Sequence, residues 1–323
     1  MTDQTAIEVD EIHQPPRSQW LDVWDQFKKH RGAVIGAIVF LLILFGVFVG
    51  PLIYAQDAQY VPTGRKFLEL RDIRPIYTLL WDSGAKVDWT RPLGTDNIGR
   101  DALARLMQGG QVSITVGLAA MLLSVILGTF IGVLAGYFRR LDGILMRLTD
   151  LFLALPLLPL LLVAVLLFRE PLKNAFGTEG GVFVLIVTLV GITSWMQTAR
   201  IVRGDVIALK EREFVLAARS IGTPPRRMIT RHLLPNVLSP IMVSATLGLA
   251  TAIITESALS FLGLGFPSDF PTWGKILFDS VDRMTSFPER VIWPGLAISL
   301  TVLSVNYIGD GLRDALDPRI RGL

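Results

Sequence analysis

The chain reads EFVLAARSIGTPPRRMITRHLLPN from Glu213 to Asn236, a basic segment between two long apolar runs. Apolar residues recur there at helical spacing and predict one apolar face on a short helix: Phe214, Ala217, Ala218 and Ile221. Gly222 suits the position just beyond a helix end, where left-handed backbone favours glycine. Thr223 and Pro224 are typical of an N-cap and a first-turn proline, so we expect a second helix that runs until Pro235 interrupts it. The pattern predicts a helix, a sharp turn and a second helix.

Composition places the chain in a membrane. Of its 323 residues, 51% are hydrophobic, and the mean hydropathy is +0.50, which is too apolar for an ordinary soluble domain of this length. There are no cysteines, which excludes disulfides and thiolate metal sites. The net charge of +3 is too small to predict a nucleic-acid partner, because basic residues in a membrane chain more often mark cytoplasmic loops.

Apolar stretches close to the ~20 residues that cross a bilayer core predict the spans. There are six, at 33–53, 112–138, 151–168, 182–199, 237–255 and 291–308. Residues 1–17 are polar and are expected to form a disordered cytoplasmic tail. Residues 18–31 place tryptophans on one helical face and end in lysines, which predicts an interfacial amphipathic helix, with a functional lid as the alternative. The first transmembrane helix then occupies 32–53.

The basic residues of the short loops predict the orientation. Lysine and arginine concentrate before the first span and after the second, fourth and sixth, so these loops and both termini should be cytoplasmic. The long polar segment 54–111 is then an external loop subdomain, periplasmic or extracellular. Residues 112–309 are expected to form a core of five transmembrane helices that contains the cytoplasmic loop 200–235, and 310–323 a cytoplasmic tail.

Small residues and prolines are expected to shape the packing of the spans. Gly128, Gly132 and Gly136 repeat at intervals of four residues, which predicts a ridge where a neighbouring helix approaches closely. Pro156 and Pro159 should kink the third span, either as a packing device or to shape a pathway.

Two acids lie close to apolar runs. Glu256 follows Pro235 by about twenty residues, hence roughly 30 Å along a helix, which predicts a solvated or structural acid near the outer interface. A proton or cation relay is the alternative. Asp150, beside Arg147, is interpreted as a charge at the N-terminus of the third span. Both placements argue against an ion-coupled carrier.

Motifs for catalysis or metal binding are not evident. The sequence contains no GxxxxGK[ST] loop, so the chain itself is not expected to hydrolyse ATP. Its three histidines are scattered, and no nucleophile can be paired with a base, so we predict no enzymatic activity and no bound cofactor. In LGTDNIGRDALAR, the acids Asp96 and Asp101 lack the spacing of a calcium loop, and a turn leading into a helix from Asp101 is the preferred interpretation.

Several sequence blocks together carry a family resemblance. In the opening stretch, Ala217 and Ala218 precede Gly222 by a fixed interval, and the segment ends in His232-Leu-Leu-Pro-Asn236. The other blocks are LGTDNIGRD (93–101), GVLAGYFRRLDGILMRLTDLFLALP (132–156), ALSFLGLG (258–265) and GDGLRDALDPR (309–319). With these blocks the chain resembles the inner-membrane permease subunits of binding-protein-dependent ABC importers, in particular the second, C-type permease of dipeptide and oligopeptide systems.

The resemblance implies a type I ABC importer permease fold, all-α, with six transmembrane helices in a bacterial or archaeal cell membrane. It implies that Glu213–Ile221 is a coupling helix that docks on a separate ATPase. The residues expected at this contact are Glu213, Phe214, Ala217, Ala218, Arg219 and Gly222. Those expected to close the loop are His232, Leu234, Pro235 and Asn236. Leu216 stands where the family has an acid, which leaves Glu213 as the candidate to replace it.

The implied partners are a second permease in a heterodimer, two ATPases that bind ATP and Mg²⁺, an extracytoplasmic substrate-binding protein and membrane lipid. Di- or oligopeptides would enter the cytoplasm by alternating access, although similar permeases also serve nickel chelates and oligosaccharides. An ion-coupled secondary transporter is the alternative function. For the opening stretch alone, the alternative is an ordinary helix pair that closes the bundle.

Overall fold

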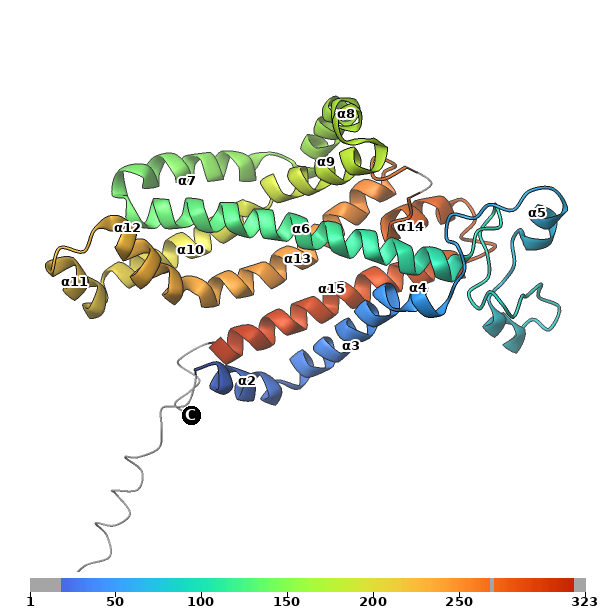
Figure 1. The fold of residues 1–323 in the computed structure, drawn as a ribbon, viewed down its shortest axis with the longest axis horizontal. Helices are drawn as coiled ribbons and strands as arrows, with labels where there is room; N and C mark the ends of the chain where they lie inside the picture. The colour runs from blue at the N-terminus through green and yellow to red at the C-terminus, as the bar shows by residue number, and fades with distance from the viewer. Residues whose placement is uncertain (1–18, 268–269, 317–323) are drawn as a thin grey trace, which may run out of the picture.

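The computed structural model describes residues 19–267 and 270–316. The regular structure in this part of the chain is helical (Figure 1). The longer helices are α3 (Arg31–Phe48), α6 (Ala102–Tyr137), α7 (Arg139–Ala154), α8 (Leu157–Phe176), α9 (Thr178–Ile192), α10 (Trp195–Lys210), α13 (Leu238–Phe261) and α15 (Glu289–Leu316). The shorter ones are α2 (Gln19–Lys29), α4 (Gly50–Ile53), α5 (Arg65–Leu70), η2 (Ile76–Leu80), α11 (Glu213–Ser220), α12 (Pro225–Arg227), η3 (Met228–Leu233), η4 (Leu234–Val237) and α14 (Trp273–Val281).

Five helical segments of the described chain are long and apolar enough to cross a membrane, and a sixth is added if the bent pair α7–α8 forms one span. The other broken segment, α9 with α10, counts as a single span of 33 residues. The helices extend beyond the apolar runs that predict them. In particular, α6 begins ten residues before Val112, and α15 continues to Leu316, so the first part of the predicted tail 310–323 is helical. The predicted tail 1–17 lies outside the described residues.

The predicted glycine ridge is confirmed. Gly128, Gly132 and Gly136 lie on the side of α6 that packs against α10. A Cβ atom at Gly132 would lie 2.6 Å from the carbonyl oxygen of Ala199, and one at Gly136 would lie 2.7 Å from the Cβ of Val206. Only glycine allows the two backbones to approach this closely, which gives two membrane helices a large van der Waals contact.

The third predicted span is broken rather than kinked. Helix α7 ends at Ala154, and α8 begins at Leu157 after a bend of 88°. Pro156 lies in the break, where its ring and missing N–H prevent α7 from continuing. The interpretation of Asp150 as an N-terminal charge is therefore wrong: it lies in the C-terminal part of α7 and forms an ion pair with Arg200 of α10.

The two ends of the bundle differ (Figure 1). Helices α11 and α12 project at one end, and at the other the long loop between α4 and α6 packs with α14. Helix α3 packs along α15, and α13 packs against both α15 and α6. Helix α2 lies against α15, with Val23 buried and Trp24 exposed, as expected of an amphipathic helix at a surface.

Candidate functional site

The short helix α11 ends in a rigid backbone turn. Gly222 has φ +77°, the left-handed conformation that was predicted for it. The N–H of Thr223 donates to the carbonyl of Ala218 at 3.2 Å, and the N–H of Gly222 donates to the carbonyl of Arg219 at 3.0 Å. These two bonds form a Schellman motif, which satisfies carbonyl groups that the end of a helix otherwise leaves unpaired. The turn fixes the direction in which the chain leaves α11.

The buried face of α11 differs from the predicted one. Val215 and Ala218 are buried against Met228 of η3 and its neighbours, while Phe214 and Ala217 are exposed. Ile221, predicted to lie on the apolar face, is 84% exposed. The prediction failed because six of the nine residues from Glu213 to Ile221 are apolar, so spacing alone allows more than one face.

The second half of the predicted helix pair is one continuous helical path. Its first helix, α12, begins at Pro225 after Pro224, so Thr223 is not the N-cap. The path then changes from α to π geometry in η3 and to a tighter turn in η4 before it enters α13. Pro235 therefore does not interrupt the helix. The Nδ2 of Asn236 donates to the carbonyl of His232 at 2.7 Å, which supplies a bond inside this irregular turn.

Of the other predicted loop-closing residues, Leu234 packs beside the cluster that includes Val215 and Leu233, and His232 is half-buried. The contact residues Glu213 and Arg219 are exposed on α11. The structure thus brings Ala218 and Leu234 into one packed cluster. It leaves most of the predicted contact residues, together with Leu216, on the surface.

Lys210, the last residue of α10, fixes the start of the connection to α11 against α6. Its Nζ donates to the carbonyls of Gly136 and Tyr137, each at 3.1 Å, and lies 5.8 Å from the ring centroid of Tyr137. These carbonyls belong to the last turn of α6, where a cation also interacts favourably with the helix dipole. Sequence reasoning treated Lys210 only as a loop charge. No local pattern links it to a helix end 73 residues away.

The opposite end of the bundle is held by charged side chains. Asp279 of α14 forms ion pairs with Arg100, Arg105 and Lys275, and Asp96 is bound by both arginines. The LGTDNIGRD block is thereby fixed to α14. As predicted, Asp101 is the N-cap of α6 and accepts the N–H of Ala104 at 2.7 Å. Burial raises the pKa of Asp101, and this bond partly opposes the shift.

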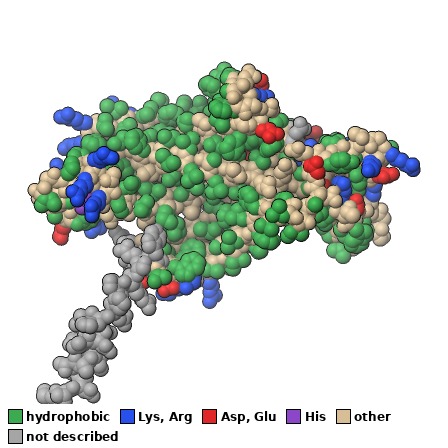
Figure 2. Space-filling view, in the orientation of Figure 1, with side chains coloured by type: hydrophobic (Ala, Val, Ile, Leu, Met, Phe, Trp, Pro, Cys, Tyr) green, Lys and Arg blue, Asp and Glu red, His purple; other side chains and the backbone are tan. Residues whose placement is uncertain are grey.

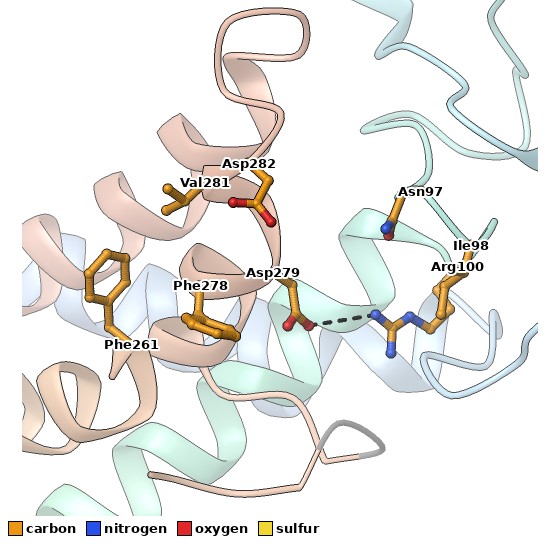
Figure 3. A pocket seen from close by; sticks show the side chains of 8 residues that line it. All are labelled: Asn97, Ile98, Arg100, Phe261, Phe278, Asp279, Val281 and Asp282. Carbon is orange, nitrogen blue, oxygen red and sulfur yellow. Dashed lines mark ion pairs between the residues drawn. The ribbon is translucent and has the colours of Figure 1, made fainter. Parts of the chain in front are cut away.

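A pocket of about 470 Å³ opens beside this network (Figure 3). The loop before α6 contributes Asn97, Ile98 and Arg100; Phe261 lies at the end of α13, and α14 and the residue after it supply the remaining side chains. In Figure 3 the two phenylalanines lie on one side and the loop residues on the other. The eight described lining residues include no serine, cysteine or histidine, so the pocket offers no nucleophile–base pair.

Glu256 is fully buried, so the interpretation of this acid as solvated is wrong. Ser260 donates to its Oε1 at 2.7 Å, and Ser113 of α6 donates to its Oε2 at 2.9 Å. The Oγ of Ser113 also accepts the N–H of Trp273 at 3.2 Å. The carboxyl group therefore joins α6, α13 and the start of α14. Distance along the helix could not predict this burial, because the covering residues come from distant parts of the chain.

Comparison with known proteins agrees with this architecture. Residues 107–322 match the family described as the binding-protein-dependent transport system inner membrane component. Residues 18–68 match the N-terminal transmembrane domain of oligopeptide transport permease C. The resemblance seen in the sequence blocks is thereby confirmed.

Curated relatives match over nearly the whole chain. A dipeptide transport system permease protein of Alkalihalophilus pseudofirmus is 37% identical and covers 94% of this chain and 91% of its own length. An oligopeptide transport system permease protein of Bacillus subtilis is 35% identical and covers 98% and 95%. A glutathione transport system permease protein of Pectobacterium atrosepticum is 33% identical and covers 94% and 93%. The chain belongs to the binding-protein-dependent transport system inner membrane component family, and it is a multi-pass membrane permease rather than an enzyme.

Proposed function

We propose that this permease is the C-type subunit of a peptide importer, and that it moves di- or oligopeptides into the cytoplasm together with a second permease. The names of the relatives favour a peptide cargo, since two of those described above belong to dipeptide and oligopeptide systems. One observation supports a mechanism in which a separate ATPase docks on this chain. Helix α11 is a rigidly capped element that projects from the bundle with apolar side chains exposed.

The exposed face of α11 is suited to docking on another protein. Phe214, Leu216 and Ile221 are large apolar side chains in contact with solvent, while Val215 and Ala218 hold the helix on its own subunit. A surface helix that has no partner does not normally expose this many apolar groups. The proposed occupant is a groove on a separate ATPase, with Glu213 and Arg219 at the polar edge of the contact.

The orientation follows from the positions of basic residues. Arginines gather around α11 and α12, at the end of the bundle toward which α2 and the end of α15 also lie (Figures 1 and 2). The preference of basic residues for the cytoplasmic side supports placing this end, and both termini, in the cytoplasm. The six-span topology then requires that α7 and α8 serve together as the third span. The loop between α4 and α6 lies outside the cell.

The rigid connections of α11 give a route for coupling. ATP and Mg²⁺ would be bound by two partner ATPases, whose approach on ATP binding would carry α11 with them. Lys210 ties the end of α10, which leads into α11, to α6, and η3 connects the buried face of α11 to α13. This movement would therefore reach the spans as a change between two packed states. An extracytoplasmic binding protein would deliver the peptide to the outward-facing state.

Co-purification tests this assignment. The tagged full-length chain, extracted in mild detergent from its native host, is expected to bring down two ATPase subunits, or two copies of one, and a second permease. Addition of ionophores should leave peptide uptake unchanged, because the driving force is ATP. A chain that purifies alone, and whose uptake collapses with the ion gradient, would contradict the proposal.

A further inference from the structure

The external loop carries large apolar side chains that its own fold does not cover. Leu80 is 83% exposed, Trp81 67% and Trp89 75%. The backbone around Trp89 is nevertheless held, because Asp88 accepts the N–H of Thr90 at 2.9 Å and the Thr90 hydroxyl at 2.7 Å. The exposure of these large apolar side chains is therefore a property of the folded loop, and it indicates an interaction surface.

Two contacts fix the segment 76–90 over the outer ends of neighbouring spans. The hydroxyl of Tyr54, which directly follows α4, lies within hydrogen-bond distance of the carbonyl oxygen of Thr90, at 2.9 Å, and of the Oδ2 of Asp101, at 2.7 Å. At the other end of the segment, the Nε1 of Trp293 in α15 donates to the hydroxyl of Tyr77 at 3.0 Å, and the ring centroids of Tyr77 and Trp81 are 5.8 Å apart. Since α3 packs along α15, the segment bridges the outer ends of one helix pair.

The segment lies near exposed apolar side chains of the spans, because Tyr54, whose hydroxyl is 2.9 Å from the carbonyl oxygen of Thr90, directly follows Leu52 and Ile53. Leu52 and Ile53 of α4, beside Tyr54, are both largely exposed, and α3 presents further large apolar side chains below them. In Figure 2, hydrophobic side chains gather along the lower edge of the external subdomain. This proximity favours a lipid contact over an isolated patch that faces water.

We propose that residues 76–90 lie in the interfacial region of the outer leaflet, with Leu80, Trp81 and Trp89 inserted among the lipid headgroups. Tryptophan favours this region because its ring is apolar while its N–H can still reach water or headgroup oxygens. The loop would then anchor the outer ends of α3 and α15 at a fixed depth. This inference rests on the external position of the loop in the proposed function.

Fluorescence quenching at single cysteines tests the proposal. The native chain has no cysteine, so Leu80→Cys can be labelled with an environment-sensitive dye while both tryptophans stay in place. The assembled complex is reconstituted in phosphatidylcholine vesicles. A complex that contains the wild-type chain, treated with the same dye, measures the fluorescence that comes from labelled cysteines of the other subunits. We expect a nitroxide near the headgroup of the lipid to quench the dye several-fold more than aqueous iodide does, and Trp89→Cys should behave alike.

Two further positions make each outcome decisive. Lys66→Cys, on the exposed part of α5, should be quenched by iodide and not by lipid. Phe45→Cys, exposed on α3, should be quenched by a nitroxide deep in the acyl chains. If Leu80→Cys and Trp89→Cys behave like Lys66→Cys, the lipid contact is overturned while the proposed function stands. Protection of both positions from both quenchers would also overturn the lipid contact, and would indicate a protein partner. Failure at Phe45 would overturn the membrane placement itself.

Discussion

Replacement of Gly222 by valine is expected to uncouple ATP hydrolysis from transport while the protein still inserts and assembles. Gly222 has φ +77°, and left-handed backbone costs about 1–2 kcal/mol for a residue that carries a Cβ. No other atom lies within 4 Å of a Cβ placed there, so the penalty comes from the backbone and not from a clash. Relief of this strain would break the Schellman bonds and turn α11 away from its docking direction.

The measurement is peptide uptake per ATP hydrolysed in reconstituted complex. A loss of roughly tenfold is expected, since each ~1.4 kcal/mol changes an equilibrium tenfold. Gly222→Asn is the matched control, because asparagine tolerates left-handed backbone far better than valine does and should retain most of the coupling. Wild-type uptake by Gly222→Val would show that the turn after α11 does not matter for transport.

Replacement of Gly132 by valine is expected to damage the fold itself. The new Cβ would lie 2.6 Å from the carbonyl oxygen of Ala199 and 2.9 Å from the Cβ of Val202, both on α10. The first of these is backbone and can move only if the two helices separate. Overpacking of a well-packed core typically lowers the free energy of unfolding by ~1–3 kcal/mol. Separation of α6 and α10 would also remove van der Waals contacts along the rest of their interface.

Thermal unfolding in detergent measures this effect. The melting temperature and the yield of assembled complex should both fall for Gly132→Val. Gly46→Val is the control, since Gly46 also lies in a membrane helix but a Cβ added there would meet no other atom within 4 Å. Equal stability of the two variants would contradict the close approach of α6 and α10.

Local features were predictable from the sequence where one residue type has a specific backbone role. Gly222 takes the left-handed position after α11, Asp101 caps α6, and the ridge of glycines on α6 meets a neighbouring helix. Each of these depends on residues close together in the chain or on a regular spacing. The apolar stretches likewise predicted five candidate membrane-spanning helical segments, and the sixth depends on whether the bent pair α7–α8 is one span.

Features that depend on distant partners were not predictable. The spacing around α11 could not separate Val215 from Phe214, because both are apolar and the cluster that buries Val215 forms only when η3 folds back. Pro156 indicated a kink, but its size of 88° depends on how α8 packs against α9. Glu256 is buried by groups that include Ser113, 143 residues earlier in the chain.

The ion pairs that hold the long loop between α4 and α6 give a further example. The carboxylate of Asp72, itself at φ 56°, accepts bonds from Arg283 at 3.1 Å and Arg290 at 2.9 Å. These arginines lie more than 200 residues away, and no local pattern in the sequence indicates that they bind Asp72. Charge counting predicts only a side of the membrane, and not the pairing that fixes the loop to the start of α15.

A cysteine scan of α11 tests the central claim most directly. Single cysteines from Glu213 to Gly222, in a chain that has none, would be labelled with a short photo-crosslinker in the assembled complex. The exposed positions Glu213, Leu216 and Arg219 should give a crosslinked product with an ATPase subunit, while buried Val215 and the distant Lys66 should not. If no position from Glu213 to Gly222 reaches an ATPase subunit, α11 is not the docking element.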